Sequence, residues 1–219
     1  MEYLDIKYNK NEKPITSYPK KFAEYNINRF LLKGKKVLEI GCGRGDVSNS
    51  FYKLGVDLHT VDIDDYSKKF LDSDIKFEKC NLEKENLPFD NNTFDLVYSK
   101  SVLEHIVNPD NFFKEIKRVL KKDGFIVIYT PDWETQYKNF FDDITHVKPY
   151  TINSLKQIHL KYEFRFLSAE KFYQLPITWK FPFIKLLCNF LSIFTPIRSK
   201  IKFLRFSKEL MILSIAKKK

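Results

Sequence analysis

The stretch VLEIGCGRGD, Val37 to Asp46, decides the fold of this chain. Its apolar first half predicts a short buried strand, and three glycines at alternate positions then predict a tight turn. A helix is expected from about Asp46 to Leu54, so that its amino terminus points at the turn. A strand, a glycine turn and a helix in this order form a ligand-binding corner in an open α/β sheet.

Two kinds of nucleotide cofactor compete for this turn. A dinucleotide site needs its third glycine at the position of Asp46, whereas the glycines here follow the pattern G-x-G-x-G over residues 41–45. Glu39, just before the turn, suits a cationic amino group better than a pyrophosphate. Asp62 ends the next predicted strand about twenty residues on, where a carboxylate can accept both hydroxyls of a ribose. The residues therefore disfavour a dinucleotide.

Strand and helix signals alternate along the rest of the chain. This alternation predicts a parallel α/β sheet with right-handed connections. Helical spacing of apolar residues also runs from Phe22 to Leu31, within an N-terminal helical segment at 1–33. Strands are expected at 37–40, 58–63, 75–79, 94–99, 125–129, 163–169 and 209–216, and further helices at 46–54, 67–71, 109–120 and 151–160.

Length and composition fit one globular domain over residues 1–219. The chain is 43% hydrophobic and 16% aromatic, which excludes an intrinsically disordered protein. The three cysteines, Cys42, Cys80 and Cys188, form neither a disulfide framework nor a zinc motif and suit a reducing cytosol. The N-terminus lacks the apolar region of a signal peptide, and the apolar stretch Phe181–Ile197 is broken by Lys185. We therefore expect a cytoplasmic location, or a peripheral one at the inner face of the membrane.

The positive charge is concentrated in the last third of the chain. The formal net charge is +10, and residues 148–219 hold 15 Lys and Arg against three acids. Such a basic segment suits either an anionic partner or a plain solvated face. Nucleic acid is the less favoured partner, because the sequence contains no recognisable RNA-binding module. A small-molecule, sugar or lipid-linked partner is favoured, and the oligomeric state stays open.

Four motifs follow one another in a fixed order: VLEIGCGRGD, VDID at 61–64, CNLEKENLPFDNNTFDLVYSKSVLEHI at 80–106, and EIKRVLKKDGFIVIYTP at 115–131. Together they resemble the class I methyltransferases that use S-adenosylmethionine. The resemblance covers roughly residues 20–170 and the last strand. It implies a Rossmann-like, seven-stranded mixed sheet with helices on both faces, and S-adenosylmethionine as cofactor.

The resemblance also implies which residues hold the cofactor. Asp62 would accept the ribose hydroxyls, Ile63 would pack against the adenine, and Asn81 would accept from the adenine amino group. Asn81 is a departure, since the family usually has Asp there. A second departure is Asp123-Gly124, which replaces a more usual Gly-Gly turn. The remaining contacts expected are Glu39, Gly41, Cys42, Gly43, Gly45, Leu82 and Ser99.

Methyl transfer to a hydroxyl needs a base, and neutral histidine is the natural one at pH 7. His146 lies in FDDITHVKPYT, 141–151, which resembles a loop of methyltransferases that act on surface glycans and small molecules. We expect His146 to be the base, with Asp142 or Asp143 orienting it or binding substrate. The alternative is that these residues have a structural role only and hold the loop in place. His59 and His159 lie in a strand and a helix and are not expected to act.

His105, in Leu103-Glu104-His105, is the second candidate base. In the quinone-precursor O-methyltransferases an acid three residues before this Glu completes a metal site. That position holds Ser101 here, so no metal is expected.

The least family-like region is the insert at 170–207, between the last two strands. Its aromatic residues alternate with Lys and Arg, so Trp179–Arg205 is expected to form one or two amphipathic helices on an anionic membrane or over a lipid-linked substrate. A plain substrate lid is the alternative. The activity expected is O-methylation of a sugar, glycan or lipid-linked small molecule. The alternatives are a quinone-type O-methyltransferase at the membrane and a non-catalytic, cofactor-binding partner subunit.

Overall fold

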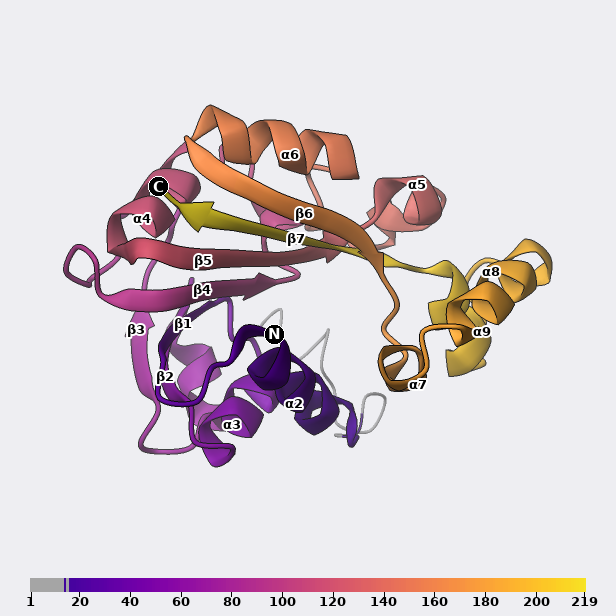
Figure 1. Ribbon diagram of the computed structural model, residues 1–219, viewed down its shortest axis with the longest axis horizontal. Coiled ribbons are helices and arrows are strands. Elements are labelled where there is room, and N and C mark those ends of the chain that lie inside the picture. The colour runs from indigo at the N-terminus through magenta and orange to yellow at the C-terminus, as the bar shows by residue number, and fades with distance from the viewer. Residues whose placement is uncertain (1–13, 15) are drawn as a thin grey trace.

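The computed structural model describes Pro14 and residues 16–219, and the rest of the expected N-terminal segment lies outside the described residues. Seven strands form one mixed sheet in the order β3-β2-β1-β4-β5-β7-β6, with β7 antiparallel to its neighbours (Figure 1). This confirms the predicted sheet. The strands are β1 (Lys36–Ile40), β2 (Asp57–Asp62), β3 (Lys76–Lys79), β4 (Phe94–Lys100), β5 (Leu120–Pro131), β6 (Phe164–Phe172) and β7 (Met211–Lys218).

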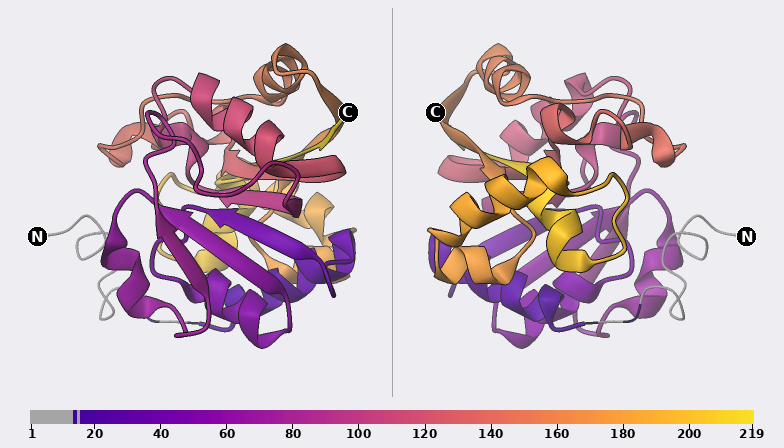
Figure 2. Two further views of the ribbon diagram at one scale, coloured as in Figure 1. Left: turned by 90° about the vertical axis from the view of Figure 1, so that its left-hand side faces the viewer. Right: turned by 90° about the vertical axis from the view of Figure 1, so that its right-hand side faces the viewer.

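Helices cover both faces of the sheet, as expected (Figures 1 and 2). Apolar residues of α4 (Asp110–Val119) and α6 (Ile152–Lys161) pack in a core on one face. Those of α2 (Tyr18–Phe30) and α3 (Asp46–Lys53) pack in a second core on the other face. The second core includes one buried polar link, in which Tyr129 on β5 donates its hydroxyl to Asn26 on α2. Both faces of the parallel strands are thus buried, which explains their continuous apolar runs.

The carboxyl ends of the parallel strands meet at one edge of the sheet. Ile40 lies beside Val61 and Ser99 in the strand register, so β1, β2 and β4 end together. Short 3-10 helices follow two of them, η1 (Asp65–Phe70) after β2 and η2 (Leu103–His105) after β4. The expected helix at 67–71 corresponds to η1. The register places the turns that carry the predicted cofactor residues side by side.

β5 is longer than predicted, because it begins before the Asp123-Gly124 turn. Phe94 pairs with Leu120, and Leu96 pairs with Phe125, so the residues between Leu120 and Phe125 form an excursion within the strand. Asp123 has φ +60° there. A short polar side chain tolerates this left-handed conformation, which accounts for Asp at a position where the family often has Gly.

After β5 the chain forms a loop with two short helices, α5 (Trp133–Gln136) and η3 (Phe140–Asp142), which the sequence did not predict. The insert between β6 and β7 forms three helices: α7 (Pro176–Lys180), α8 (Ile184–Phe194) and α9 (Lys202–Lys208). One or two were expected. They enclose a small core around the fully buried Cys188 and project beyond the sheet (Figure 1). No helix in the described part of the chain is long and apolar enough to cross a membrane.

Candidate active site

The glycine turn after β1 packs directly against the loop after β4. Gly41 has φ +77°, and a Cβ there would lie 2.2 Å from Cγ2 of Val102. A side chain is therefore excluded at Gly41 both by backbone strain and by collision. Gly43 differs, because its Cβ would meet no atom of the described residues within 4 Å. The turn thus leaves open space at its tip, where a ligand can approach the backbone.

Asp62, at the end of β2, is held in place by two main-chain donors. The amides of Gly43 and Ile63 each donate to its carboxylate at 2.8 Å. Burial raises the pKa of the Asp62 carboxyl, whereas these two hydrogen bonds lower it. The next side chain, Ile63, is 59% exposed. A fixed carboxylate beside an exposed apolar side chain suits a ribose and an adjoining flat base.

Glu39 and Ser99 are buried polar residues near the end of β1 and β4. Burial raises the pKa of Glu39 to about 7, although the Ser48 hydroxyl donates to its carboxylate at 2.6 Å. The Ser99 hydroxyl is buried and has no hydrogen-bond partner within residues 16–219. A buried polar group of this kind is costly unless a ligand satisfies it. Burial raises the pKa of the Cys42 thiol, so Cys42 stays a neutral thiol beside Asp62.

The loop after β3 carries Asn81 and Leu82. The Asn81 side-chain oxygen accepts the main-chain N–H of Glu83 at 3.1 Å. The main-chain N–H of Asn81 donates to the Glu85 carboxylate at 2.7 Å. The amide oxygen of Asn81 has a second lone pair with which to accept from an adenine amino group. Leu82 is buried and belongs to the core under the sheet.

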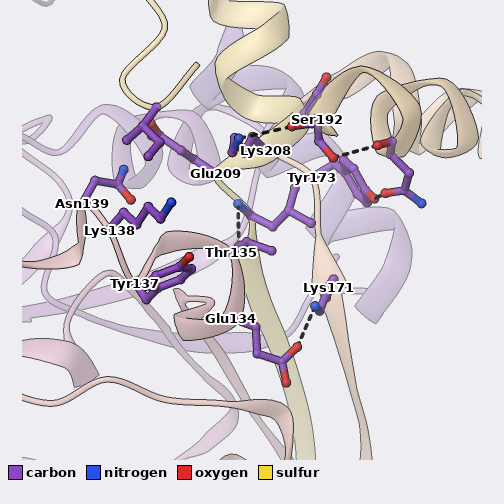
Figure 3. A pocket seen from close by; sticks show the side chains of 14 residues that line it. Glu134, Thr135, Tyr137, Lys138, Asn139, Lys171, Tyr173, Ser192, Lys208 and Glu209 are labelled. Carbon is purple, nitrogen blue, oxygen red and sulfur yellow. Dashed lines mark hydrogen bonds and ion pairs between the residues drawn. The ribbon is translucent and has the colours of Figure 1, made fainter. Parts of the chain in front are cut away.

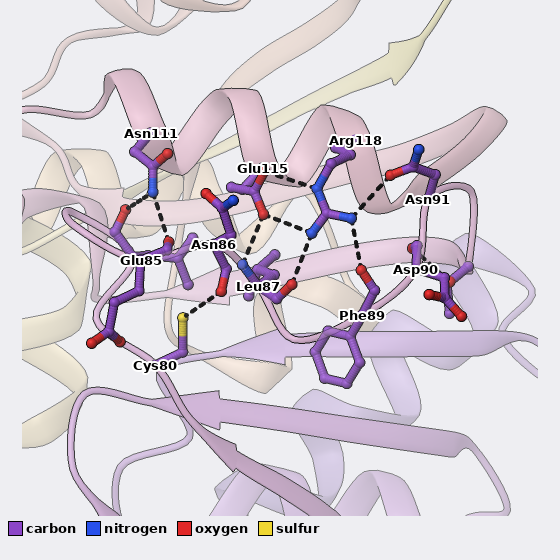
Figure 4. A network of polar contacts seen from close by, with 12 residues as sticks. Cys80, Glu85, Asn86, Leu87, Phe89, Asp90, Asn91, Asn111, Glu115 and Arg118 are labelled. Carbon is purple, nitrogen blue, oxygen red and sulfur yellow. Dashed lines mark hydrogen bonds and ion pairs between the residues drawn. The ribbon is translucent and has the colours of Figure 1, made fainter.

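Side chains of α4 hold this loop against the sheet (Figure 4). Asn111 donates to the carbonyls of Leu82 and Glu85 at 3.0 and 2.7 Å. Arg118 donates to the carbonyls of Leu87 and Phe89 at 2.8 and 2.7 Å. These contacts supply donors to main-chain oxygens of the loop, and the Leu87 carbonyl also accepts the amide of Phe89. The sequence did not predict this clamp of Asn111 and Arg118, because its hydrogen bonds join residues about thirty positions apart.

His105 and His146 come together beside the loop after β4. Their rings lie 4.8 Å apart in an edge-to-face arrangement. Nδ1 of His146 lies 2.6 Å from the Phe140 carbonyl, and Nδ1 of His105 lies 3.1 Å from the Thr145 carbonyl. A carbonyl oxygen only accepts, so each Nδ1 carries the proton and Nε2 is the basic nitrogen of each neutral ring.

The loop that carries His146 is tied to the loop after β4 through main-chain contacts. The Glu104 carbonyl accepts the amides of Val147 and Lys148 at 2.9 and 3.1 Å. Val102, which packs against Gly41, lies within the same short segment as Glu104 and His105. The segment at 102–105 therefore contacts the glycine turn on one side and the loop that carries His146 on the other.

Of the two acids proposed as partners of His146, Asp143 is the nearer. Its carboxylate lies 3.8 Å from Nε2 of His146 and accepts the Thr145 hydroxyl at 2.7 Å. Asp142 instead pairs with Arg198 of the insert at 2.5 Å. The structure does not bring Asp142 to the imidazole, because η3 points its side chain outward. His59 and His159 are buried, and burial lowers the pKa of each to about 4.

Known proteins show the same organisation. A family model described as "Methyltransferase domain" matches residues 38–128. An uncharacterised protein of Methanocaldococcus jannaschii is 30% identical, over 90% of this chain and 86% of its own length. A solved S-adenosylmethionine-dependent methyltransferase from Archaeoglobus fulgidus superposes with a TM-score of 0.67 at 22% identity, covering 99% of this chain and all of the other. The chain belongs to the class I S-adenosylmethionine-dependent methyltransferases.

The similarity is also clear to enzymes of known substrate, but only over part of their length. A ubiquinone biosynthesis O-methyltransferase of Glaesserella parasuis is 32% identical over 51% of this chain and 52% of its own. The chain spans about half or less of the length of the first curated relatives it matches. The expected family, fold and cofactor are thus confirmed, and the acceptor remains to be proposed.

The cofactor of this methyltransferase family fits the residues present. Open space in front of Gly43, the fixed Asp62 carboxylate, the exposed Ile63 and the unsatisfied Ser99 hydroxyl lie at one sheet edge. These are the features that a nucleoside with a charged amino acid tail requires. Asp62 would hold the ribose, and Glu39 would face the amino group.

The same region of the methyltransferase brings three side chains together that could ligate a metal ion. Glu104, His105 and His146 each offer a ligand atom, and these atoms lie within 4.8 Å of one another. The sequence predicted no metal, because Ser101 stands at the position where the quinone-precursor O-methyltransferases have an acidic ligand. His146, which comes from a different loop, offers a third ligand that the motif alone did not reveal.

A cavity of the methyltransferase lies between the loop after β5 and the insert (Figure 3). Its volume is about 650 Å³. Its walls mix polar and apolar side chains, and Lys171 pairs with Glu134 beside it at 2.7 Å. The same loop lines the cavity at 137–139 and carries His146 further along.

Proposed function

We propose that this protein methylates a hydroxyl group of a small-molecule acceptor, with His146 as the base. The observation that carries the proposal is the pair of imidazoles in the loops after β4 and β5, each with its Nδ1 bound to a main-chain carbonyl. That arrangement orients both rings and makes Nε2 the proton acceptor. Asp143 lies close enough to stabilise the imidazolium that forms when His146 takes the proton.

The bound cofactor supplies a methyl group on a positively charged sulfur. Asp62 fixes the ribose, and the glycine turn lets the backbone approach the rest of the molecule. His146 would take the acceptor's proton at Nε2 as the acceptor oxygen takes the methyl group and the cofactor's sulfur leaves as a neutral thioether. The products are the methyl ether, S-adenosylhomocysteine and a proton on His146.

The acceptor that we favour is a sugar, a glycan or a lipid-linked small molecule. The loop FDDITHVKPYT supports this class, since it resembles the acceptor loop of such methyltransferases. The cavity beside that loop supports it as well, because its lining includes Asn139, Asn189 and Ser192, whose side chains can hydrogen-bond hydroxyl groups. Its lysines, Lys138, Lys171 and Lys208, would suit an acceptor that also carries an anionic group.

A quinone-type O-methyltransferase is the second candidate. It is supported by the partial similarity to a ubiquinone biosynthesis O-methyltransferase and by the cluster of Glu104, His105 and His146. Metal dependence separates the two candidates. A quinone-type enzyme with a metal at this cluster would lose turnover with a chelator and regain it with Mg²⁺ or Zn²⁺. An enzyme that uses His146 as its base without a metal would keep its turnover in the presence of the chelator.

Two measurements test the proposal. Calorimetry with S-adenosylhomocysteine should show binding that Asp62→Ala abolishes and that Asp64→Ala leaves intact, since Asp64 only caps η1 through Tyr66. Transfer of labelled methyl from S-adenosylmethionine into cell extracts, divided into lipid and aqueous fractions, then identifies the acceptor class. Cofactor binding without any labelled product would instead support a partner subunit that does not catalyse.

A further inference from the structure

Helix α8 exposes a continuous apolar face. Leu186, Phe190 and Ile193 follow one another at spacings of four and three, so they form one stripe along the helix. Leu186 is 74% and Ile193 72% exposed, and Phe183 just before the helix is 70% exposed. Neighbouring exposed apolar side chains enlarge the face: Ile177, Phe181, Leu187, Phe194 and Ile201. A patch of this kind is unusual on a lone protein surface and marks a contact with a partner.

The opposite side of the insert is well packed, so the exposed stripe belongs to an ordered helix. Cys188 is fully buried in the small core formed with Tyr173, Leu175 and Leu210. Lys208 at the end of α9 donates to the carbonyls of Ser192 and Thr195 at 3.2 and 2.7 Å, which ties α9 to the end of α8. The side chains in the stripe are therefore presented outward by a fixed scaffold.

The charged residues of the insert from position 171 onward have a single sign, although Lys171, Arg198 and Arg205 pair with acids of neighbouring segments. Residues 171–208 contain eight Lys and Arg and no Asp or Glu. Lys180, Lys200 and Lys202 are exposed on the same projecting lobe. A protein partner with a mixed surface would not require this bias, whereas an anionic lipid surface does. The alternation of aromatic and basic residues is also the composition of helices that lie in a membrane interface.

We propose that α8 and the preceding Phe181–Phe183 segment insert into the headgroup region of an anionic lipid bilayer. The lysines would lie over the lipid phosphates, and α8 would lie flat. In Figure 1 the insert projects beyond the end of β6 and the start of β7, and the right-hand view of Figure 2 faces its helices. Docking by this face would place the cavity between the insert and the loop after β5 near the bilayer. This inference deepens the proposed lipid-linked acceptor, but it does not depend on turnover.

The test is flotation of the whole chain with vesicles, without cofactor or acceptor. Wild type should float with phosphatidylcholine vesicles that contain phosphatidylglycerol, and should stay unbound with phosphatidylcholine alone. A variant with Leu186→Ser, Phe190→Ser and Ile193→Ser should bind at least about tenfold more weakly, because apolar burial is lost. A variant with Lys180→Gln, Lys200→Gln and Lys202→Gln should lose about fivefold per charge.

Matched controls separate this effect from general stickiness or misfolding. Leu160→Ser on α6 and Leu167→Ser on β6 remove exposed apolar side chains elsewhere, and they should bind vesicles like wild type. Every variant should keep its melting temperature and its affinity for S-adenosylhomocysteine. The proposal is overturned if wild type does not bind anionic vesicles. It is also overturned if light scattering shows that wild type is a dimer and that only the α8 variant is a monomer. Failure of flotation leaves methyl transfer untouched, and failure of methyl transfer leaves flotation untouched.

Discussion

Arg198 and Asp142 form a two-point ion pair, with Nε to Oδ2 at 2.5 Å and Nη2 to Oδ1 at 2.7 Å. Arg198 also donates to the Lys138 carbonyl at 3.2 Å. Arg198 belongs to the insert, and Asp142 belongs to the loop that carries His146. The pair therefore links the least family-like part of the chain to the proposed catalytic base.

Replacing Arg198 should loosen that loop without unfolding the protein. Both members of the pair are exposed, so Arg198→Gln should leave the melting temperature nearly unchanged. Amide hydrogen exchange should become faster over residues 138–147, because the loop loses its anchor to the insert. Arg165→Gln, which breaks an exposed pair with Asp123 far from this loop, is the control. Unchanged exchange at 138–147 would show that the pair does not hold the loop.

The two histidines should differ in their effect on turnover. His146→Ala should keep the affinity for S-adenosylhomocysteine and lower kcat by about 10² to 10⁴, the usual contribution of a positioned base. His105→Ala should cost less, because His105 lies beside the base in this assignment. Single-turnover methyl transfer measures both. If His105→Ala is the more damaging change and His146→Ala retains turnover, the roles are reversed.

The clamp on the loop after β3 should control cofactor affinity. Asn111→Ala and Arg118→Ala each remove two hydrogen bonds to main-chain carbonyls of the loop that carries Asn81 and Leu82. Each should weaken S-adenosylhomocysteine binding by about tenfold, since such bonds contribute about 1 kcal/mol apiece. Lys117→Ala, on the same helix but paired with Glu163, should bind like wild type. Calorimetry distinguishes these results directly.

Glu39 should make the unliganded protein less stable as the pH rises. Burial raises its pKa from 4.5 to about 7, so between these values the folded state binds more protons than the unfolded state. Stability is therefore lost as the pH rises through this window, by about 3 kcal/mol at most.

Glu39→Gln removes that loss. It should stabilise the protein at pH 8 and have little effect near pH 5, while weakening cofactor binding. Urea unfolding at both pH values measures the difference, and the exposed Glu24→Gln on α2 is the control. Equal effects at the two pH values would contradict the assignment.

Most of the sheet and the cofactor corner could be predicted from residues close in sequence. The strand before Gly41, the glycine spacing and the acid at Asp62 are local signals, and each appears where it was expected. Helices were expected over Trp179–Arg205, and α8 and α9 lie there, but the short helices α5 and α7 were not predicted. Each of these two is about one turn long, which is too short for a helical period to show in the sequence.

The sequence by itself determined the order of strands and helices, the family and the glycine turn with Asp62 beside it, because these depend on periodicity and on spacing within short motifs. Only the tertiary structure decided which groups act together. His105 meets the Thr145 carbonyl across 40 positions, Asp142 meets Arg198 across 56, and Asp143 rather than Asp142 lies near His146. Contacts of this kind arise from how the loops pack at the edge of the sheet, and no local pattern encodes them.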